Sequence, residues 1–341
     1  MKYVNKITDV IGNTPLLKLG KTVAHLKPTI FMKLEYLNPA GAVKDRMAYY
    51  IVKEGEKSGK LKKGDTLVDN SSGNAAIATS MVAAALGYKA VFAVADKTSR
   101  EKIDLIKAYG ADVIITPTHV PWDDPRSSYM RAYELGQKPG YFYISQYHNQ
   151  LNVEAHYKHT GPEIWEDTNG KITHFVAGIG TGGTISGAGK FLKEKNPDIK
   201  VIGVDPEGSM FYDWVNNGTT EGLELYPCKV EGIGTDMIVK AFHPEYVDYV
   251  IRAWDKDSFR VARQLAREEG ILGGGTTGAH LWAAMEIAKE LDESAIIVTL
   301  ACDSGQRYLS KMFSDEWMRE QGFDIEEKGH ATVSLEQGRQ I

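Results

Sequence analysis

Short runs rich in β-branched and aromatic residues alternate with longer helical patterns along most of the 341-residue chain. This alternation limits the fold more than any other feature, because it is typical of helices packed on parallel sheets. The predicted strands are Thr29–Leu34, Thr66–Val68, Ala90–Val94, Asp112–Thr116, Phe142–Ile144, His174–Ala177, Lys200–Val204 and Ala295–Leu300. The predicted helices are Asp45–Ser58, Asn74–Leu86, Ser99–Tyr109, Ser127–Leu135, Asn152–Trp165, Thr184–Lys195, Asp257–Glu269 and Thr277–Glu290. The sequence therefore predicts an α/β fold.

Glycines mark the ends of several of these helices. Gly87, Gly110 and Gly270 each follow a predicted helix, where a left-handed residue commonly closes the last turn. The residues after Phe323 are polar and lack a core pattern. We therefore expect 324–341 to be a tail that is ordered only by a partner or not at all.

Composition argues against several classes of function. The net charge is -5, so no attraction to nucleic acid or to anionic membranes is expected. No apolar run approaches the roughly 20 residues that span a bilayer, and Met1–Leu19 lacks the apolar core of a signal peptide. Cys228 and Cys302 are too few for a disulfide framework and lack metal-ligand spacing. We expect a cytoplasmic globular protein.

Three polar segments carry candidate chemistry. Lys44 lies in Asn38–Arg46, where a solvated charge cluster is the ordinary outcome, and Ser71–Ala75 forms a small polar turn. Gly180–Thr184 lies between a predicted strand and a predicted helix, where glycines let backbone N–H groups approach a phosphate. A tight turn without a ligand is the alternative for this loop. A lysine, a polar turn and a phosphate loop in this order favour pyridoxal phosphate chemistry.

Histidines offer a second candidate site. His148, His156 and His159 lie close together in the sequence, but no carboxylate or cysteine completes a metal-binding set with them. We expect surface histidines on a helix and no metal.

The three polar segments resemble the signature of fold type II (β-family) pyridoxal phosphate enzymes. Ile11–Leu16 resembles the opening segment of that family, and Gly203–Ser209 and Phe313–Met318 resemble later motifs. Within the family the chain is similar to cysteine synthases and, more closely, to the catalytic core of cystathionine β-synthase. The resemblance runs from roughly residue 5 to residue 323.

This resemblance implies two three-layer α/β domains with the cofactor in the cleft between them. Residues 1–44 and 149–323 would form the larger, cofactor-binding domain, and 45–148 the smaller, mobile domain that carries the substrate loop. It also implies a homodimer. Because the chain begins near the opening segment and few residues follow the matched region, haem and adenosylmethionine control are not expected.

The resemblance implies roles for individual residues as well. Lys44 would form the Schiff base with pyridoxal 5'-phosphate and then remove the Cα proton of the substrate. The implied cofactor-binding residues are Lys44, Asn74, Gly180, Thr181, Gly182, Gly183, Thr184 and Ser304. The implied substrate-binding residues are Ser71, Ser72, Gly73, Ala75, Gln146, Gly232 and Gly234. A hydroxyl that caps a helix is the alternative for Ser304.

The implied reaction is β-replacement on a serine-type amino acid. A neutral Ser304 at the pyridine nitrogen makes the ring a weaker electron sink than a carboxylate would, which favours loss of a β-leaving group. Serine, O-acetylserine or O-phosphoserine would give an aminoacrylate, to which a thiol or sulfide adds to form cystathionine or cysteine. A β-eliminating lyase (a serine/threonine dehydratase or a cysteine desulfhydrase) is the alternative among enzymes. A scaffold that binds a partner is the alternative outside them.

Four positions depart from the family pattern. Ala75 and Ala42 replace residues with hydroxyl groups, Thr235 stands where the cystathionine β-synthase branch has tyrosine, and Cys302 replaces a proline. A lost hydrogen bond to a charged group costs about 1.5–3 kcal/mol unless another donor substitutes. One hypothesis is a roomier pocket that accepts an unusual β-substituted donor. Neutral drift, with a water in the gap, is the alternative.

Overall fold

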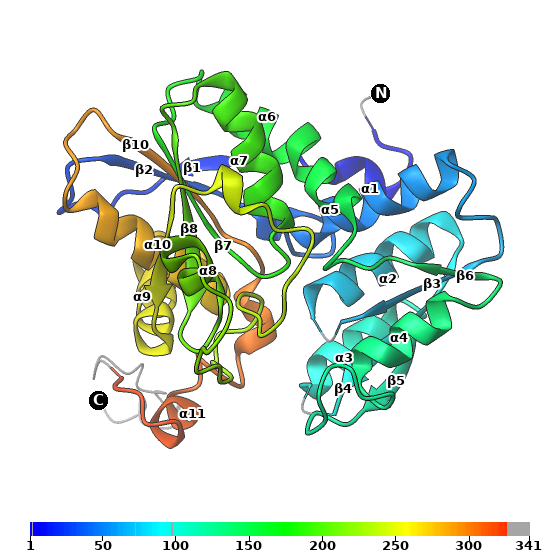
Figure 1. Ribbon diagram of the computed structural model, residues 1–341. Coiled ribbons are helices and arrows are strands. Elements are labelled where there is room, and N and C mark those ends of the chain that lie inside the picture. Colours follow the sequence, from blue (N-terminus) through cyan, green and yellow to red (C-terminus); the bar gives the residue numbers. More distant parts are fainter. Residues whose placement is uncertain (2, 72, 97, 326–341) are drawn as a thin grey trace, which may run out of the picture.

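The computed structural model describes residues 1, 3–71, 73–96 and 98–325, and its strands form two separate sheets (Figure 1). The strands of the six-stranded sheet are, in spatial order, β1 (Leu16–Lys18), β2 (Thr29–Lys33), β10 (Ile296–Leu300), β7 (His174–Gly178), β8 (Lys200–Pro206) and β9 (Tyr249–Ala253). Those of the four-stranded sheet are β5 (Asp112–Thr116), β4 (Lys89–Ala95), β3 (Thr66–Asn70) and β6 (Tyr141–Tyr143). Every neighbouring pair is parallel except β1 with β2. The predicted α/β class is confirmed.

Helices cover both sheets. The α-helices are α1 (Lys44–Lys57), α2 (Asn74–Leu86), α3 (Arg100–Ala108), α4 (Ser128–Gly136), α5 (Gln150–Ala155), α6 (Gly161–Asp167), α7 (Gly183–Lys195), α8 (Phe211–Asn217), α9 (Asp255–Glu269), α10 (Gly275–Ala288) and α11 (Asp315–Glu320). The 3₁₀ turns span Ile7–Val10, Glu35–Leu37, Pro244–Tyr246 and Gly305–Tyr308. Gly87, Gly110 and Gly270 have the positive φ angles expected after a helix. Within the described residues, no helix is both long enough and apolar enough to cross a membrane.

The predicted helix Asn152–Trp165 is helical throughout, but it is not α-helical throughout. α5 ends at Ala155, a π-helical turn spans His156–Thr160, and α6 begins at Gly161. Pro162 lies in the first turn of α6, where a residue without an N–H group begins a helix more readily than it continues one. Pro162 was therefore the sequence feature that indicated a change in helix type, which the hydrophobic periodicity alone does not reveal.

Four elements have no counterpart among the predicted ones. These are β1, β9, α8 and α11, which are 3, 5, 7 and 6 residues long. β1 and β9 lie at the two edges of the larger sheet. α8 and α11 span about two helical turns, which gives too few positions for a helical period to be recognised.

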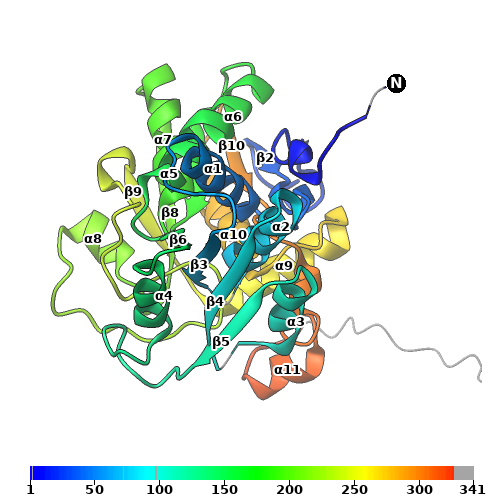
Figure 2. The same cartoon turned by 90° about the vertical axis from the view of Figure 1, so that its right-hand side faces the viewer.

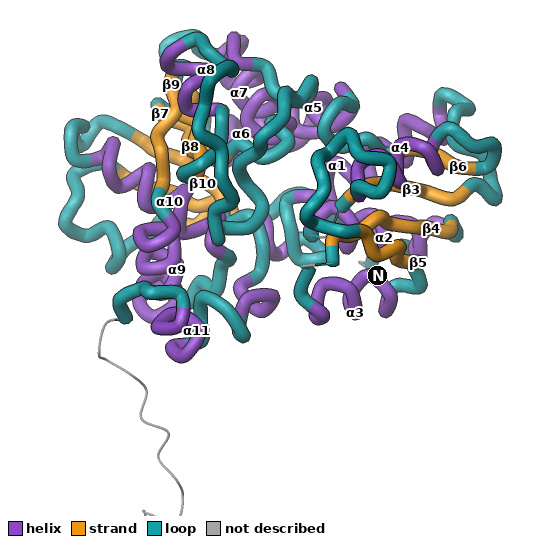
Figure 3. The backbone as a smooth tube through the Cα atoms, turned by 60° about the horizontal axis from the view of Figure 1, so that its bottom comes forward, coloured by secondary structure: helices purple, strands orange, loops and turns teal. Residues whose placement is uncertain are grey.

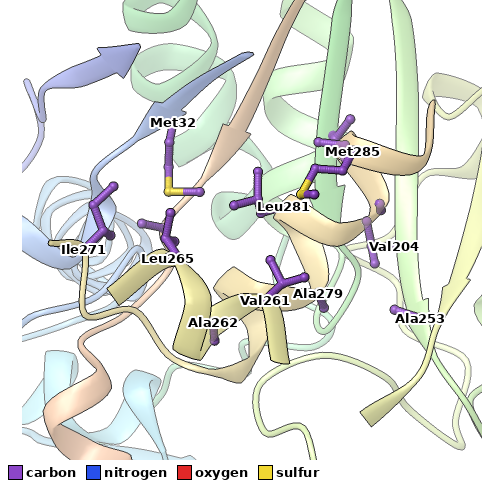
Figure 4. Close-up of a cluster of buried hydrophobic side chains, with 14 of the residues drawn as sticks. Met32, Val204, Ala253, Val261, Ala262, Leu265, Ile271, Ala279, Leu281 and Met285 are labelled. Atoms are coloured by element: carbon purple, nitrogen blue, oxygen red, sulfur yellow. The ribbon is translucent and has the colours of Figure 1, made fainter. Parts of the chain in front are cut away.

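The strands of the larger sheet are buried on both faces. Along β7, Val176 belongs to the core cluster beneath α9 and α10, whereas Phe175 and Ala177 belong to the cluster beneath α7. Figure 4 shows the first of these clusters, in which Met32 of β2 and Leu281 of α10 both lie. Burial on both faces is typical of parallel sheets, because their crossover helices cover the two sides.

The smaller sheet is also covered on both faces. Leu67 of β3 packs in one cluster with Met47 of α1 and Ile77 of α2. The next residue, Val68, packs in another cluster with Ala132 of α4. Figure 2 turns this smaller sheet toward the viewer. Alternate residues along one strand therefore serve two different helical layers.

The carboxyl ends of strands from both sheets meet at one cavity. Asn70 ends β3, Ala95 ends β4, Gly178 ends β7 and Leu300 ends β10, and all four line the same cavity. Figure 3 shows the two groups of strands as separate units connected by helices and loops. Ligands of open α/β sheets bind outside the carboxyl ends of the strands, so this cavity is the expected place for a functional site.

A buried ion network lies beside the start of α1. Arg46 Nε is 2.7 Å from Glu35 Oε2, and Arg46 Nη1 is 2.6 Å from Glu163 Oε1. Lys33 Nζ is 3.0 Å from Glu163 Oε2. Burial raises the pKa of Glu163, but hydrogen bonds from Arg46 outweigh this and lower it to about 2. The network ties β2, α1 and α6 together while keeping the Glu163 carboxylate charged.

Replacing Arg46 with methionine is expected to lower the free energy of unfolding by about 3–5 kcal/mol, because the buried Glu35 carboxylate loses its cation and Glu163 keeps only Lys33. Lys53→Met is the matched control, since Lys53 pairs with Glu56 near the surface of α1 and its loss should cost less than about 1 kcal/mol. Denaturant unfolding at pH 7 measures both. Equal costs for the two variants would contradict a structural role for the network.

Candidate active site

A cavity of about 680 Å³ lies between the two sheets, a size typical of small-molecule sites. Ser72 falls outside the described residues. The predicted site residues that line the cavity are Lys44, Ser71, Gly73, Asn74, Ala75, Gln146, Gly180, Thr181, Gly182, Thr184, Gly232 and Gly234. Residues that are far apart in the sequence are thus brought to one place.

Lys44 is the first residue of α1, and its Nζ lies 3.2 Å from Thr181 Oγ1. The solvated charge cluster considered for this segment is wrong, because Asp45 and Arg46 are both buried. Burial lowers the pKa of Lys44 to about 8, although the neighbouring Cys302 and Asp69 raise it. A substantial fraction of the amine is therefore neutral at mildly alkaline pH, and the neutral amine is the form that attacks an aldehyde.

The loop Gly180–Thr184 leads from β7 into α7. Gly182 has a φ of 84°, and a Cβ atom there would lie 2.4 Å from Cβ of Phe242. A Cβ atom at Gly180 would lie 2.5 Å from the carbonyl oxygen of Gly232. Only glycine fits at either position. The first N–H groups of α7 have no acceptor within the helix, so they and the Thr181 hydroxyl can bind a phosphate.

Gly183 does not line the cavity, unlike the other residues of this loop. A Cβ atom at this position would lie 2.2 Å from Asn152 Oδ1. Asn152 Nδ2 in turn donates a hydrogen bond of 2.9 Å to Thr181 Oγ1. Gly183 therefore makes room for a side chain that holds the loop.

The residues present fit pyridoxal phosphate. A phosphate needs a helix N-terminus with close backbone approach, and the start of α7 supplies both. An aldehyde needs an amine that can lose its proton, and burial gives Lys44 that property. Lys44 lies on the connection from β2 to β3, and the phosphate loop lies on the connection from β7 to β8, yet both line one cavity.

Asn74, the first residue of α2, is held by side chains that the sequence analysis did not single out. Arg307 donates through Nη1 to Asn74 Oδ1 and through Nη2 to the carbonyl oxygen of Ala40. Asn74 Nδ2 donates to Asp303 Oδ2 at 2.8 Å, and the Tyr308 hydroxyl donates to the same oxygen at 2.6 Å. One N–H of the amide is left for another acceptor. Arg307 also joins α2 to the loop before α1.

Ser304 does not line the cavity. Its Oγ accepts a hydrogen bond of 3.3 Å from the backbone N–H of Gln306 and caps the 3₁₀ turn that follows. The capping alternative is thus observed, but the hydroxyl proton of Ser304 is not used in this bond, so the contact with the pyridine nitrogen stays a prediction. Thr276 does line the cavity, and it follows the glycine run Gly273–Gly275. That glycine run resembles the phosphate loop in composition. It could have indicated from the sequence that Thr276 belongs to the site.

Two of the four departures from the family pattern line the cavity, namely Ala75 and Cys302. Ala42 is fully buried and pairs with Asp303 in an isolated β-bridge, and Thr235 lies outside the cavity wall. The hypothesis of a roomier donor pocket therefore rests on Ala75 alone.

Cys302 lies beside a histidine that the sequence analysis did not consider. Its Sγ is 3.7 Å from Nδ1 of His280, and both residues line the cavity. Nε2 of His280 accepts a hydrogen bond of 2.6 Å from the N–H of Gly178. Burial lowers the pKa of His280 to about 4, so the ring is neutral, and burial raises the pKa of the Cys302 thiol. Both groups are uncharged near neutral pH.

The prediction of surface histidines is wrong for His156. This residue is fully buried, and its ring nitrogens lie 2.9 Å from Thr160 Oγ1 and 3.2 Å from Thr184 Oγ1. It therefore supports the phosphate loop from behind. His148 is partly buried and His159 is exposed. In the part of the chain that the structure describes, no three His, Cys, Asp or Glu side chains form a metal-binding group.

Comparison with known proteins agrees with this site. The family described as "Pyridoxal-phosphate dependent enzyme" matches residues 7–303. The chain is 41% identical over 325 residues to cystathionine beta-synthase of Apis mellifera, covering 94% of this chain and 64% of that protein. It is 40% identical over 310 residues to cysteine synthase of Staphylococcus aureus, covering 91% of this chain and 96% of that protein. The chain thus spans less than two thirds of the first relative and nearly all of the second.

Solved structures give the same result. The O-acetylserine dependent cystathionine beta-synthase of Helicobacter pylori superposes with a TM-score of 0.83 at 36% identity, covering 91% of this chain and 99% of that one. A hydrogen sulfide-producing enzyme of Fusobacterium nucleatum superposes with a TM-score of 0.81 at 35% identity, covering 90% and 98%. The chain belongs to the pyridoxal-phosphate-dependent enzyme family, and pyridoxal phosphate is its cofactor.

Proposed function

We propose that the protein catalyses β-replacement on a serine-type amino acid with a thiol or sulfide, giving cystathionine or cysteine. The donor is serine, O-acetylserine or O-phosphoserine. The observation that carries this proposal is that Lys44 Nζ lies beside the phosphate loop in the cavity that Asn74 and Gln146 also line. The similarity to cystathionine beta-synthases and cysteine synthases supports the same reaction. The alternative is a β-eliminating lyase, which would release the elimination product before any acceptor adds.

Each part of the cavity has a task in this reaction. Pyridoxal phosphate, when bound, supplies the aldehyde that takes up the substrate amine and the ring that draws electrons from Cα. The start of α7 and Thr181 bind its phosphate. Lys44 Nζ would hold the cofactor and would take the proton from Cα of the substrate. Asn74 would donate its remaining N–H to the phenolic oxygen.

The donor carboxylate binds at the start of α2. Ser71 and Gly73 precede this helix and line the cavity, where the partial positive charge of the helix N-terminus favours an anion. Gln146 is buried against them, and its Nε2 donates to the carbonyl oxygen of Asn70 at 3.2 Å. Gly232 and Gly234 lie across the cavity on the loop that covers the phosphate site.

We also propose the domain limits 1–44 plus 149–323 and 45–148. Every strand of the smaller sheet falls within 45–148, and every strand of the larger sheet falls outside it, which supports this division. A homodimer is supported by the exposed apolar side chains of Tyr3, Ile7 and Val10 near the N-terminus. Two unpaired cysteines suit the reducing cytoplasm.

Lys44→Ala is expected to abolish β-replacement and the visible absorbance of the bound cofactor, because the amine beside the phosphate loop is lost. Lys57→Ala, at the exposed end of the same helix, is the control and should retain both. Each donor is incubated with sulfide, with homocysteine and without an acceptor. Mass spectrometry of the products then measures the activity. A fully active Lys44→Ala variant would refute the catalytic role of Lys44. If the wild-type enzyme forms a keto acid but no thioether or cysteine, the β-eliminating lyase is favoured.

The rate at which the apoenzyme takes up the cofactor should rise with pH through about 8, because only the neutral amine of Lys44 reacts and its pKa is about 8. Asp69 raises this pKa, so Asp69→Asn should move the midpoint to lower pH. Asp112→Asn, on exposed β5, is the control. Stopped-flow absorbance gives the rates. A rate that does not vary across this pH range would contradict a neutral-amine mechanism.

Arg307→Met should weaken cofactor binding by about tenfold, because Asn74 loses a charged hydrogen bond that orients its amide. Arg263→Met is the control, since Arg263 is another arginine that bonds one backbone carbonyl and one side-chain oxygen, in its case of Met312 and Asp315. Titration of both apoenzymes with the cofactor measures the dissociation constants. Equal constants for the two variants would contradict the positioning role of Arg307.

A further inference from the structure

Asn152 lies outside the cavity wall, yet it contacts two residues to which the proposed function gives different tasks. It belongs to α5 and is fully buried. α5 packs against both α1, which begins with Lys44, and α7, which follows the phosphate loop (Figure 1). The hydrogen bonds of the Asn152 side chain therefore decide what this residue does for the site.

Both hydrogens of the Asn152 amide are used. Nδ2 donates to Thr181 Oγ1 at 2.9 Å and to the carbonyl oxygen of Gln146 at 2.9 Å. Oδ1 has no hydrogen-bond partner in the described part of the chain, and it lies 2.2 Å from where a Cβ atom at Gly183 would be. A flipped amide would place an oxygen against the Gln146 carbonyl oxygen, so only one orientation of the amide is favourable.

On the cofactor side, Asn152 determines where the Thr181 hydroxyl points. A threonine hydroxyl has two lone pairs and one hydrogen. The lone pairs accept from Asn152 Nδ2 and from Lys44 Nζ, which lies 3.2 Å away. The hydrogen must point elsewhere, and Thr181 lines the cavity in which the start of α7 binds the phosphate. An amine that bonds to the cofactor has fewer hydrogens to donate, so Asn152 is the lasting constraint on this hydroxyl.

On the donor side, Asn152 holds the backbone of Gln146. This backbone follows Ser145, which has a φ of 54° although it is not glycine. A non-glycine residue keeps such a conformation only when its neighbours hold it. The Ser145 carbonyl oxygen accepts from the N–H groups of His148 and Asn149, at 3.0 Å and 2.9 Å. The bond from Asn152 then fixes the next carbonyl and keeps the Gln146 side chain in the cavity wall.

We propose that Asn152 is a positioning residue for both the cofactor phosphate and the donor carboxylate. Through Thr181 it directs a hydroxyl at the phosphate, and through Gln146 it directs an amide at the carboxylate. These two residues follow strands of different sheets, since Gln146 comes after β6 and Thr181 comes after β7. Asn152 therefore fixes the separation of the two anion-binding groups. The donor part of this inference rests on the proposed function, whereas the cofactor part does not.

Asn152→Leu nearly preserves the size of the side chain and removes both hydrogen bonds. The apoenzyme is titrated with pyridoxal phosphate and the holoenzyme with L-alanine, which has the donor's amine and carboxylate but no leaving group. Absorbance of the cofactor follows both titrations. Each dissociation constant should rise about tenfold, and the phosphorus NMR resonance of the bound phosphate should shift. The control is Asn216→Leu, because the Asn216 amide bonds only the backbone of Val250, and it should leave both constants within about twofold of wild type.

A double-mutant cycle distinguishes positioning from general damage. If Asn152 acts on the phosphate through Thr181, Asn152→Leu should weaken cofactor binding by less than about a further twofold in a Thr181→Val background. The dissociation constant for alanine should still rise about tenfold there, because a separate hydrogen bond connects Asn152 to Gln146.

Either of two results would overturn the proposal. One is an equal loss of cofactor affinity in both backgrounds, and the other is an unchanged dissociation constant for alanine. Asn152→Ala removes the same two donated bonds without placing a methyl group beside Gly183, and it takes the place of the leucine variant if that variant does not fold. A wild type that binds the cofactor and alanine but forms neither thioether nor cysteine would refute the proposed function and leave the cofactor part of this inference intact.

Discussion

The guanidinium of Arg46 holds together the part of the protein on which the site is built. It binds Glu35 and Glu163 in a region where all three side chains are largely buried, and Glu163 also accepts Lys33. A buried charge is stable only when it is paired and hydrogen-bonded, so β2, α1 and α6 have little freedom to move relative to one another. Lys44 lies two residues before Arg46 in the same first turn of α1, so the ion network also fixes the backbone position of Lys44.

The site uses the electrostatics of helix ends as well as side chains. α2 and α7 begin at the cavity, and each leaves unpaired backbone N–H groups there. A phosphate and a carboxylate suit these two ends. Lysines would repel one another in such a place unless carboxylates or anionic ligands intervened. Glu231 performs this task for Lys102 and Lys311, while burial partly neutralises Lys44.

Coupling between the two sheets runs through a few side chains at the cavity. Arg307 bonds both Asn74 at the start of α2 and Ala40 in the loop before α1. Lys102 crosses from α3 to Glu231 on the other side. These contacts mean that the small-sheet unit cannot shift without disturbing the groups that face the cofactor. A movement of the small-sheet unit that admits a substrate would therefore also change the bonds of Arg307 and Lys102 that set the geometry of the site.

Local patterns predicted most elements and much of the cavity. The glycines of Gly180–Thr184 were recognisable because a close backbone approach at a helix N-terminus requires them. Ser304 shows the limit of this reasoning, since no local pattern tells whether its hydroxyl only caps the next turn or also donates to the cofactor. The choice depends on the direction of the side chain. The π-helical turn at His156–Thr160 shows the same limit, because periodicity records apolar positions and not changes in helical pitch.

The sequence by itself determined the α/β class, the Schiff-base lysine candidate and the phosphate loop, because hydrophobic period and glycine content are local properties. Only the tertiary structure decided that Arg307 and Asp303 orient Asn74, that Thr276 and His280 line the cavity, and that the lysines gather around Glu231. These residues lie up to 233 positions apart in the chain. No local pattern records such contacts, because they arise only when the carboxyl ends of the two sheets face each other.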